Sequence, residues 1–185
     1  MAKNQPARNG FHSGGENILI LHNIRSAQNV GAIFRTAEVA GVSKIYLIGY
    51  TPAPIDRFGR KRKDIAKSAL GAEELVPWEQ KKSLPALIRK LRQDKYLIIA
   101  IEQDENSIDY KKVHLINSGR AKKLAFIAGT EVSGIPKNIL KKCDVIVEIP
   151  MRGKLARNRL PDDVGKESLN VSVAAGIALF RILNL

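Results

Sequence analysis

The chain has 185 residues, of which 44% are hydrophobic and 26% charged, a balance typical of a soluble globular domain and not of a disordered chain. It carries 31 Lys and Arg against 18 Asp and Glu, a net charge of +13, which favours a polyanionic partner such as nucleic acid over a merely solubilising charge. No apolar run is long enough for a transmembrane helix, and a single cysteine, Cys143, excludes an internal disulfide. We therefore expect a cytoplasmic protein without membrane association or a metal site.

The N-terminal half begins with a polar arm and continues into a strand and a helix. Residues 1–15 show no periodicity and predict a flexible arm, so that residues 16–185 form one domain. The apolar run Asn17–Leu21 predicts a buried strand. The next segment, Ser26–Gly41, predicts a helix because apolar residues recur at helical spacing: Val30, Ile33, Phe34, Ala37 and Ala40.

Short apolar runs predict four more strands: Lys44–Gly49, Tyr96–Ile101, Leu124–Ala128 and Val145–Ile149. Between these strands the sequence predicts three helices: Asp64–Leu70, Leu84–Leu91 and Pro136–Lys142. A link through Pro77 and Trp78 joins the first of them to the second. The last segment, Leu169–Phe180, carries no charge and predicts a buried helix. Strands that alternate with helices predict an α/β fold, with a mostly parallel sheet and helices on both faces.

Open parallel sheets bind ligands at the carboxyl ends of their strands. The segments that follow the first, fourth and fifth predicted strands combine glycine with polar residues: HNIRSAQNVGAIFR, GTEVSGIP and PMRGK. Neither a G-x-G-x-x-G fingerprint nor a P-loop is present. A nucleoside-containing ligand at this edge would therefore be held by a different loop design.

Three segments occur in a fixed order along the domain. The first is Asn23–Gly41, which contains an N-x-G-x-x-x-R pattern; the second is Ile127–Pro136, continuing to Val145–Met151; the third is Ser168–Ala175. Together they resemble the motifs of the SpoU (TrmH-like) RNA 2′-O-ribose methyltransferases of the SPOUT superfamily. The resemblance implies a C-terminal trefoil knot, S-adenosylmethionine (SAM) as the cofactor, and a homodimer to which the apolar C-terminal helix contributes.

The function that this resemblance implies is a SAM-dependent transfer of a methyl group to a ribose 2′-hydroxyl of structured RNA, with tRNA ahead of rRNA. Two alternatives remain open at this point. One is a catalytically inactive SPOUT-like RNA-binding protein. The other is an unrelated α/β enzyme that acts on a small phosphorylated substrate, which the missing nucleotide fingerprints disfavour.

The resemblance implies that five residues surround the reacting atoms: Asn29, Arg35, Glu131, Ser168 and Asn170. Arg35 matches the catalytic arginine of the family. Because arginine is a poor base, we expect it to orient a phosphate and stabilise a developing alkoxide and not to remove a proton. Gly31, one turn earlier, would leave room for a ligand on that helix face.

Each of these residues also has a purely structural interpretation. Arg35 could pair with Glu38 at i+3, and Asn29 could cap its helix. Glu131 could accept hydrogen bonds from the backbone N–H groups of residues 132–134. Ser168 could cap the last helix.

The resemblance further implies that SAM is held by backbone groups at Gly129, Ile149 and Leu169, with Met151 and Ile101 as neighbours. The apolar side chains would enclose the adenine. Ordinary core packing is the alternative for Ile149 and Leu169. Methyl transfer from a sulfonium is an in-line displacement that depends on positioning, so no metal is required.

Two basic runs predict contacts with RNA phosphates, although charged runs are also common on solvated faces. The first comprises Arg57, Arg60, Lys61, Arg62 and Lys63, and the second comprises Arg152, Lys154, Arg157 and Arg159. Neither run holds several aromatic residues, so base stacking is not the expected mode of binding. The segment 152–167 is longer than the corresponding link in the family and is rich in loop-forming residues, which predicts a mobile lid or substrate loop.

Overall fold

The computed structural model describes residues 16–113, 123–130, 133–152 and 168–185, and the statements below concern these residues. They contain seven strands: β1 Glu16–His22, β2 Lys44–Ile48, β3 Trp78–Lys81, β4 Leu97–Ile101, β5 Ile108–Asp109, β6 Lys123–Ala128 and β7 Val145–Glu148. The strands form one sheet in the order β3-β2-β1-β6-β4-β7-β5, and every pairing is parallel. The predicted parallel α/β sheet is confirmed.

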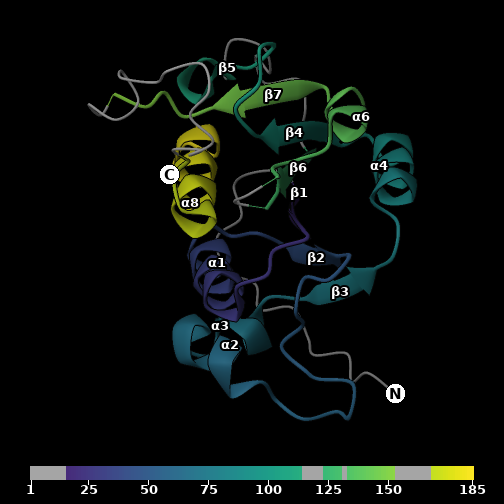
Figure 1. Ribbon diagram of the computed structural model, residues 1–185, viewed down its shortest axis with the longest axis vertical. Helices are drawn as coiled ribbons and strands as arrows, with labels where there is room; N and C mark the ends of the chain where they lie inside the picture. Colours follow the sequence, from purple (N-terminus) through teal and green to yellow (C-terminus); the bar gives the residue numbers. More distant parts are fainter. Residues whose placement is uncertain (1–15, 114–122, 131–132, 153–167) are drawn as a thin grey trace.

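Helices cover both faces of this sheet (Figure 1). On one side lie α1 Ala27–Val39, α2 Lys63–Ala69, α3 Ala72–Leu75 and α8 Val171–Ile182. On the other side lie α4 Leu84–Gln93 and α6 Lys137–Leu140. A single 3-10 turn, η1 Tyr110–Lys112, follows β5 and packs near α8.

The alternation of side chains along each strand divides the core into two layers. Leu19 and Leu21 of β1 belong to the cluster under α1, α2 and α8, whereas Ile18 and Ile20 belong to the cluster under α4 and α6. All four side chains are buried. A strand that is buried on both faces needs a continuous apolar run, and this is why the central strands could be recognised in the sequence.

The two strands that the sequence did not predict, β3 and β5, lie at the two edges of the sheet. β3 reads WEQK and occupies the segment that was predicted as a link, while β5 has only two residues. An edge strand pairs on one side only and is less enclosed, so it can be polar and short and leaves little apolar pattern.

The prediction of a buried C-terminal helix is only half right. Val171, Ala175, Ala178 and Leu179 of α8 are buried, but Val173 and Phe180 are 48% and 37% exposed. The absence of charge therefore does not reflect burial of the whole helix within one chain. It leaves α8 with a second apolar face, formed by Val173, Ile177 and Phe180 at helical spacing.

Within the described part of the chain, no helix is both long and apolar enough to cross a membrane. The same residues contain no group of three or more His, Cys, Asp or Glu side chains arranged to hold a metal ion. The predicted N-terminal arm, residues 1–15, lies outside the described residues.

Candidate active site

A cavity of about 480 Å³ opens at the carboxyl ends of β4, β6 and β7. Its walls are formed by the residues that follow these strands, and residues 168–169 and the first turns of α8 close it on one side. This is the edge at which parallel sheets usually bind their ligands. The cavity thus lies at the edge of the sheet where the sequence placed a site, and one of its three glycine-containing segments, GTEVSGIP, contributes to the wall.

Four of the five residues predicted to surround the cofactor line this cavity: Ile101, Gly129, Ile149 and Leu169. The predicted catalytic residue Ser168 lines it as well. Ile101, Ile149 and Leu169 are half-buried, and Ile101 also packs against the hydrophobic core. The fifth residue, Met151, is half-buried but is not part of the cavity wall.

Gly129 and Gly134 allow two backbone segments of the cavity wall to approach each other closely. A Cβ atom at Gly129 would lie 2.6 Å from Ile135 Cγ1 and 2.9 Å from the carbonyl carbon of Gly134. Gly134 has a φ of +64° and also lies against the Glu102 carboxylate. A larger residue at Gly129 would have to displace the backbone at Gly134 and Ile135, whereas at Gly134 it would displace the Glu102 carboxylate and adopt a left-handed conformation that favours glycine.

Acidic side chains line one side of the cavity. The Glu102 Oε2 atom accepts a hydrogen bond of 2.6 Å from the Ile135 N–H, which ties the loop after β4 to the loop after β6. Lys137 Nζ donates to Asp104 Oδ2 at 2.6 Å, and this bond lowers the pKa of Asp104 and raises that of Lys137. With Glu105 and Glu148 also in the wall, carboxylates outnumber lysine, which favours a ligand that carries positive charge.

These acidic residues were not predicted from the sequence. The signal that could have found them is the polar run EQDEN, which begins directly after the apolar run YLIIAI. A switch from apolar to acidic residues at the carboxyl end of a parallel strand marks the position of a site, although it does not specify the ligand.

Two predicted catalytic residues, 141 positions apart in the chain, are joined by a hydrogen bond from Asn170 Nδ2 to Asn29 Oδ1 of 3.1 Å. The structural alternative for Asn29, that it caps α1, is wrong, because Ser26 is the N-cap and its hydroxyl accepts from the Asn29 N–H. Likewise, α8 is capped by Asn170 and not by Ser168: Asn170 Oδ1 accepts from the Ser172 N–H at 2.9 Å. The Asn170 side chain thus caps α8 through its oxygen and is hydrogen-bonded to Asn29 of α1 through its nitrogen.

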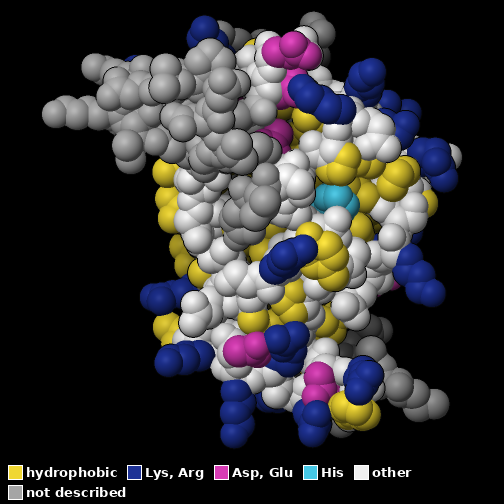
Figure 2. Space-filling model, in the orientation of Figure 1, with side chains coloured by type: hydrophobic (Ala, Val, Ile, Leu, Met, Phe, Trp, Pro, Cys, Tyr) yellow, Lys and Arg dark blue, Asp and Glu magenta, His cyan; other side chains and the backbone are white. Residues whose placement is uncertain are grey.

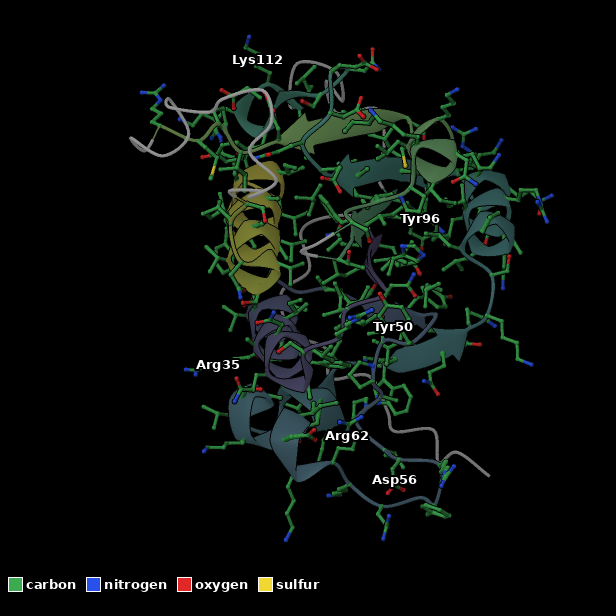
Figure 3. The ribbon with its side chains drawn as sticks, in the orientation of Figure 1. Arg35, Tyr50, Asp56, Arg62, Tyr96 and Lys112 are labelled. Atoms are coloured by element: carbon green, nitrogen blue, oxygen red, sulfur yellow. The ribbon has the colours of Figure 1, made fainter. Side chains whose placement is uncertain are left out.

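Arg35 does not lie in the cavity of its own chain. Its side chain is exposed and points away from the body of the molecule (Figure 3). Arg35 follows Asn29 by six residues, which places it about 9 Å further along α1 and about 240° around the helix axis. Within the described residues it forms no ion pair, so the predicted pairing with Glu38 is not observed.

Gly31 has a structural role that differs from the predicted one. A Cβ atom there would overlap the Ser68 hydroxyl and the Ile65 carbonyl oxygen of α2. The missing side chain therefore lets α2 pack closely against α1 and leaves no room for a ligand on that face. The prediction that Gly31 opens the helix to a ligand is wrong.

An arginine–aromatic pair that the sequence did not predict lies on the loops after β1 and β2. The guanidinium of Arg25 is 5.5 Å from the centre of the Tyr50 ring, and Tyr50 is 52% exposed. The two loops are tied together, since Asn23 Oδ1 accepts from the Tyr50 N–H and Thr51 Oγ1 accepts from the Ile24 N–H. Tyr50 is thus presented to solvent on an ordered backbone.

Ion pairs already engage much of the first basic run. Arg60 pairs with Asp56, Lys61 with Glu74, and Arg62 with Asp64. The other two members, Arg57 and Lys63, form no ion pair within the described residues and are exposed. Lys and Arg side chains gather at the lower end of the face in Figure 2, where α2 and the loop before it lie.

The second basic run cannot be placed as a whole. Arg152 is described and exposed, whereas Lys154, Arg157 and Arg159 lie outside the described residues. The same holds for Glu131 and for most of the predicted lid, residues 153–167. The structure therefore places four of the five predicted catalytic residues: Asn29, Arg35, Ser168 and Asn170.

Comparison with known proteins decides the family, because residues 16–180 match the SpoU rRNA Methylase family. The chain belongs to this family. The predicted resemblance is confirmed, and the alternative of an unrelated α/β enzyme is wrong.

Among SpoU relatives, the chain is 32% identical over 168 residues to the 23S rRNA (guanosine-2′-O-)-methyltransferase RlmB of Ralstonia nicotianae, an alignment that covers 89% of this chain and 57% of that protein. It is 31% identical over 170 residues to an uncharacterized tRNA/rRNA methyltransferase of Archaeoglobus fulgidus, covering 92% and 65% of the two chains. The chain therefore spans less than two thirds of the length of these relatives.

Solved structures agree with membership of the SpoU family. The AdoMet-bound rRNA methyltransferase from Sinorhizobium meliloti superimposes with a TM-score of 0.75 at 25% identity, covering 93% of this chain and 57% of that one. The TrmH/SpoU tRNA modifying enzyme of A. aeolicus has a TM-score of 0.71 at 21% identity, covering 92% and 75%. The second likeness concerns the fold alone.

Proposed function

We propose that the chain is a SAM-dependent RNA methyltransferase that transfers a methyl group to a ribose 2′-hydroxyl of structured RNA, with tRNA ahead of rRNA. The observation that carries the proposal is the cavity at the carboxyl ends of β4, β6 and β7, which is lined by four of the five predicted cofactor residues and by Ser168. Membership of the SpoU family and relatives named as 2′-O-methyltransferases support the same reaction.

The cavity suits SAM in size and in chemistry. Its volume of about 480 Å³ is within the usual range for a small-molecule site. Ile101, Ile149 and Leu169 would enclose the adenine, while Glu102 and Asp104 would face the positively charged part of the ligand. When bound, SAM supplies a methyl carbon on a sulfonium, whose leaving group is a neutral thioether.

The residues of the chain contribute mainly by positioning. Glu102 holds the Gly134–Ile135 backbone against Gly129, so the shape of the cavity exists before a ligand enters. The bond between Asn29 and Asn170 fixes the start of α8 beside the start of α1. Arg35 would hold a target phosphate and stabilise negative charge on the ribose 2′-oxygen.

A homodimer is part of the proposal. The second apolar face of α8, with Val173 and Phe180 exposed, offers a self-complementary surface of the kind that two-fold dimers bury. Because Arg35 points away from the cavity of its own chain, we propose that it serves the cavity of the partner copy. The trefoil knot belongs to the same proposal, supported by the fact that residues 168–169 and the start of α8 line the same cavity as the segments after β4, β6 and β7.

Replacing Asn170 by serine tests the bridge between the two helices. Serine caps a helix about as well as asparagine, so the melting temperature is expected to stay close to that of the wild type. Its side chain is too short to reach Asn29, and we expect methyl transfer to fall by up to about tenfold. Asn170→Ala, which also loses the cap, is expected to cost about 1 kcal/mol of stability in addition. Wild-type transfer by Asn170→Ser would remove the bridge from the mechanism.

Salt dependence of RNA binding tests the first basic run. Arg57→Gln combined with Lys63→Gln removes its two unpaired cations, and the slope of log K against log salt is expected to become shallower by about 1–2. The matched control is Arg89→Gln with Lys90→Gln on α4, which removes the same charge from the opposite side of the sheet. Equal slopes for the two double variants would show that net charge, and not this run, governs binding.

The experiment that decides the proposed function is a methyl-transfer assay with labelled SAM and separate pools of unmodified tRNA and rRNA. Digestion of the RNA to nucleosides then locates the label. Label on a ribose 2′-oxygen supports the proposal and identifies the substrate class. Binding of both SAM and RNA without transfer would overturn it in favour of the inactive RNA-binding protein.

A further inference from the structure

Residues 55–61, between β2 and α2, form a tight hairpin that is held by several internal hydrogen bonds. Ile55 and Lys61 pair as an antiparallel bridge, and Gly59 turns the chain with a φ of +79°. The Asp56 carboxylate accepts from the Phe58 N–H at 2.8 Å, from the Arg60 N–H at 3.0 Å and from Arg60 Nε at 2.9 Å. One carboxylate thus holds the turn in a defined shape before any ligand binds.

The hairpin displays an aromatic ring to solvent. Phe58 is 65% exposed and belongs to neither hydrophobic cluster of the core. The guanidinium groups of Arg57 and Arg60 lie 4.7 and 5.0 Å from the centre of its ring. The ring contributes nothing to the core, and its open face beside two cations leaves it accessible to a ligand.

Against the expectation that base stacking is not the mode of binding, we propose that this hairpin is a stacking site for an unpaired nucleobase of RNA. Phe58 lies against the base, and Arg57, which forms no ion pair within the described residues, lies against the adjoining phosphate. Unpaired bases stack on aromatic rings and guanidinium planes, and arginine beside the ring supplies the charge that the phosphates need. The net charge of +13 favours a nucleic acid over a protein partner. This inference rests on the proposed function, because that function makes RNA the ligand.

The pair formed by Arg25 and Tyr50 repeats the same chemistry nearer the cavity. Figure 3 shows Tyr50 between the loop that carries Asp56 and the upper half of the molecule, where the cavity lies. Two exposed rings, Tyr50 and Phe58, therefore lie on the segment between β2 and α2, each beside arginine.

Binding of fluorescein-labelled RNA to the full chain, measured by anisotropy, tests the proposal with a single-stranded oligonucleotide of mixed sequence and a duplex of the same length. Phe58→Ala is expected to weaken single-strand binding about five- to a hundredfold, and to leave duplex binding and the salt slope unchanged. Phe58→Trp is expected to restore binding, whereas Phe58→Leu is not. The matched control is Leu75→Ala, since Leu75 is 59% exposed but has no arginine over it.

Unchanged single-strand affinity in Phe58→Ala, equal losses for single strand and duplex, or full rescue by leucine would each overturn the stacking site. Phe58 is not part of the core, so the variants are expected to fold, and their circular dichroism and melting temperatures check this. The assay needs no methyl transfer. A wild-type chain that binds RNA and loses affinity in Phe58→Ala, but transfers no methyl group, would overturn the proposed function and support the stacking site.

Discussion

Replacing Arg35 by alanine is expected to lower methyl transfer by about 10²–10³-fold, the usual loss when one charge-stabilising donor is removed from a reaction site. Affinity for SAM and the melting temperature are expected to stay at wild-type values, because Arg35 is exposed and does not line the cavity. Single-turnover transfer to RNA, calorimetric titration with SAM and thermal unfolding measure the three quantities separately.

Two matched variants sharpen this prediction. Arg89→Ala removes an exposed arginine from α4, on the opposite side of the sheet, and is expected to transfer methyl groups at the wild-type rate. Arg35→Lys keeps the charge but loses the planar guanidinium, so partial activity is expected. Wild-type turnover by Arg35→Ala would show that the assigned electrostatic role is wrong.

Mixed dimers test whether Arg35 acts across the subunit boundary. If it does, unfolding and refolding equal amounts of Arg35→Ala and Gly129→Ala chains should restore about a quarter of the wild-type rate, since half of the dimers are mixed and each has one complete site. If Arg35 acted on the cavity of its own chain, every site in the mixture would lack one component and the rate would stay at that of the single variants.

Gly129→Ala is the second change for which we expect a large effect. The new Cβ atom would lie 2.6 Å from Ile135 Cγ1 and 2.9 Å from the carbonyl carbon of Gly134, so the Gly134–Ile135 segment must move. Overpacking of this kind costs about 1–3 kcal/mol, and if this cost falls on the bound state the loss of SAM affinity is roughly five- to 150-fold. Calorimetric titration with SAM measures it, and methyl transfer is expected to fall in parallel.

Gly176→Ala is the control for this change. A Cβ atom at Gly176 meets only Thr36 Cγ2, at 3.4 Å, and the position lies within α8, where alanine is the better helix former. Its SAM affinity is therefore expected to equal that of the wild type. An unchanged dissociation constant in Gly129→Ala would mean that the close approach of the two loops does not shape the cofactor site.

The central strands and the first helix could be predicted because their buried residues form local patterns in the sequence. In the helix, apolar residues recur at helical spacing, and in the strands they form continuous runs. In Ser26–Gly41 the five apolar positions at helical spacing are all buried, and the runs around Ile20, Ile99 and Phe126 form buried strands. The edge strand β3 gave no such signal, since three of its four residues are polar and it pairs on one side only. Four of the five predicted cofactor residues line the cavity, and the family motif, not periodicity, indicated them.

The contacts that build the site could not be predicted in the same way. Nothing local indicates that Glu102 accepts a hydrogen bond from the Ile135 N–H, or that Asp56 holds Phe58 in the open beside two arginines. The motif that identified Arg35 could not show that its side chain points away from the cavity of its own chain. The direction of this side chain depends on how α1 packs against α2 and α8.

By itself the sequence determined the class of fold, the family and the edge of the sheet at which a ligand is expected to bind. The spacing of apolar residues indicated the fold, and short motifs indicated the family and the site. Only the tertiary structure decided which side chains meet. Gly31 serves the packing of α2, Asn170 caps α8 while holding Asn29, and α8 keeps an apolar face exposed. The physical reason is that such contacts join segments far apart in the chain, and their geometry depends on the packing of whole elements and not on the residues next to them.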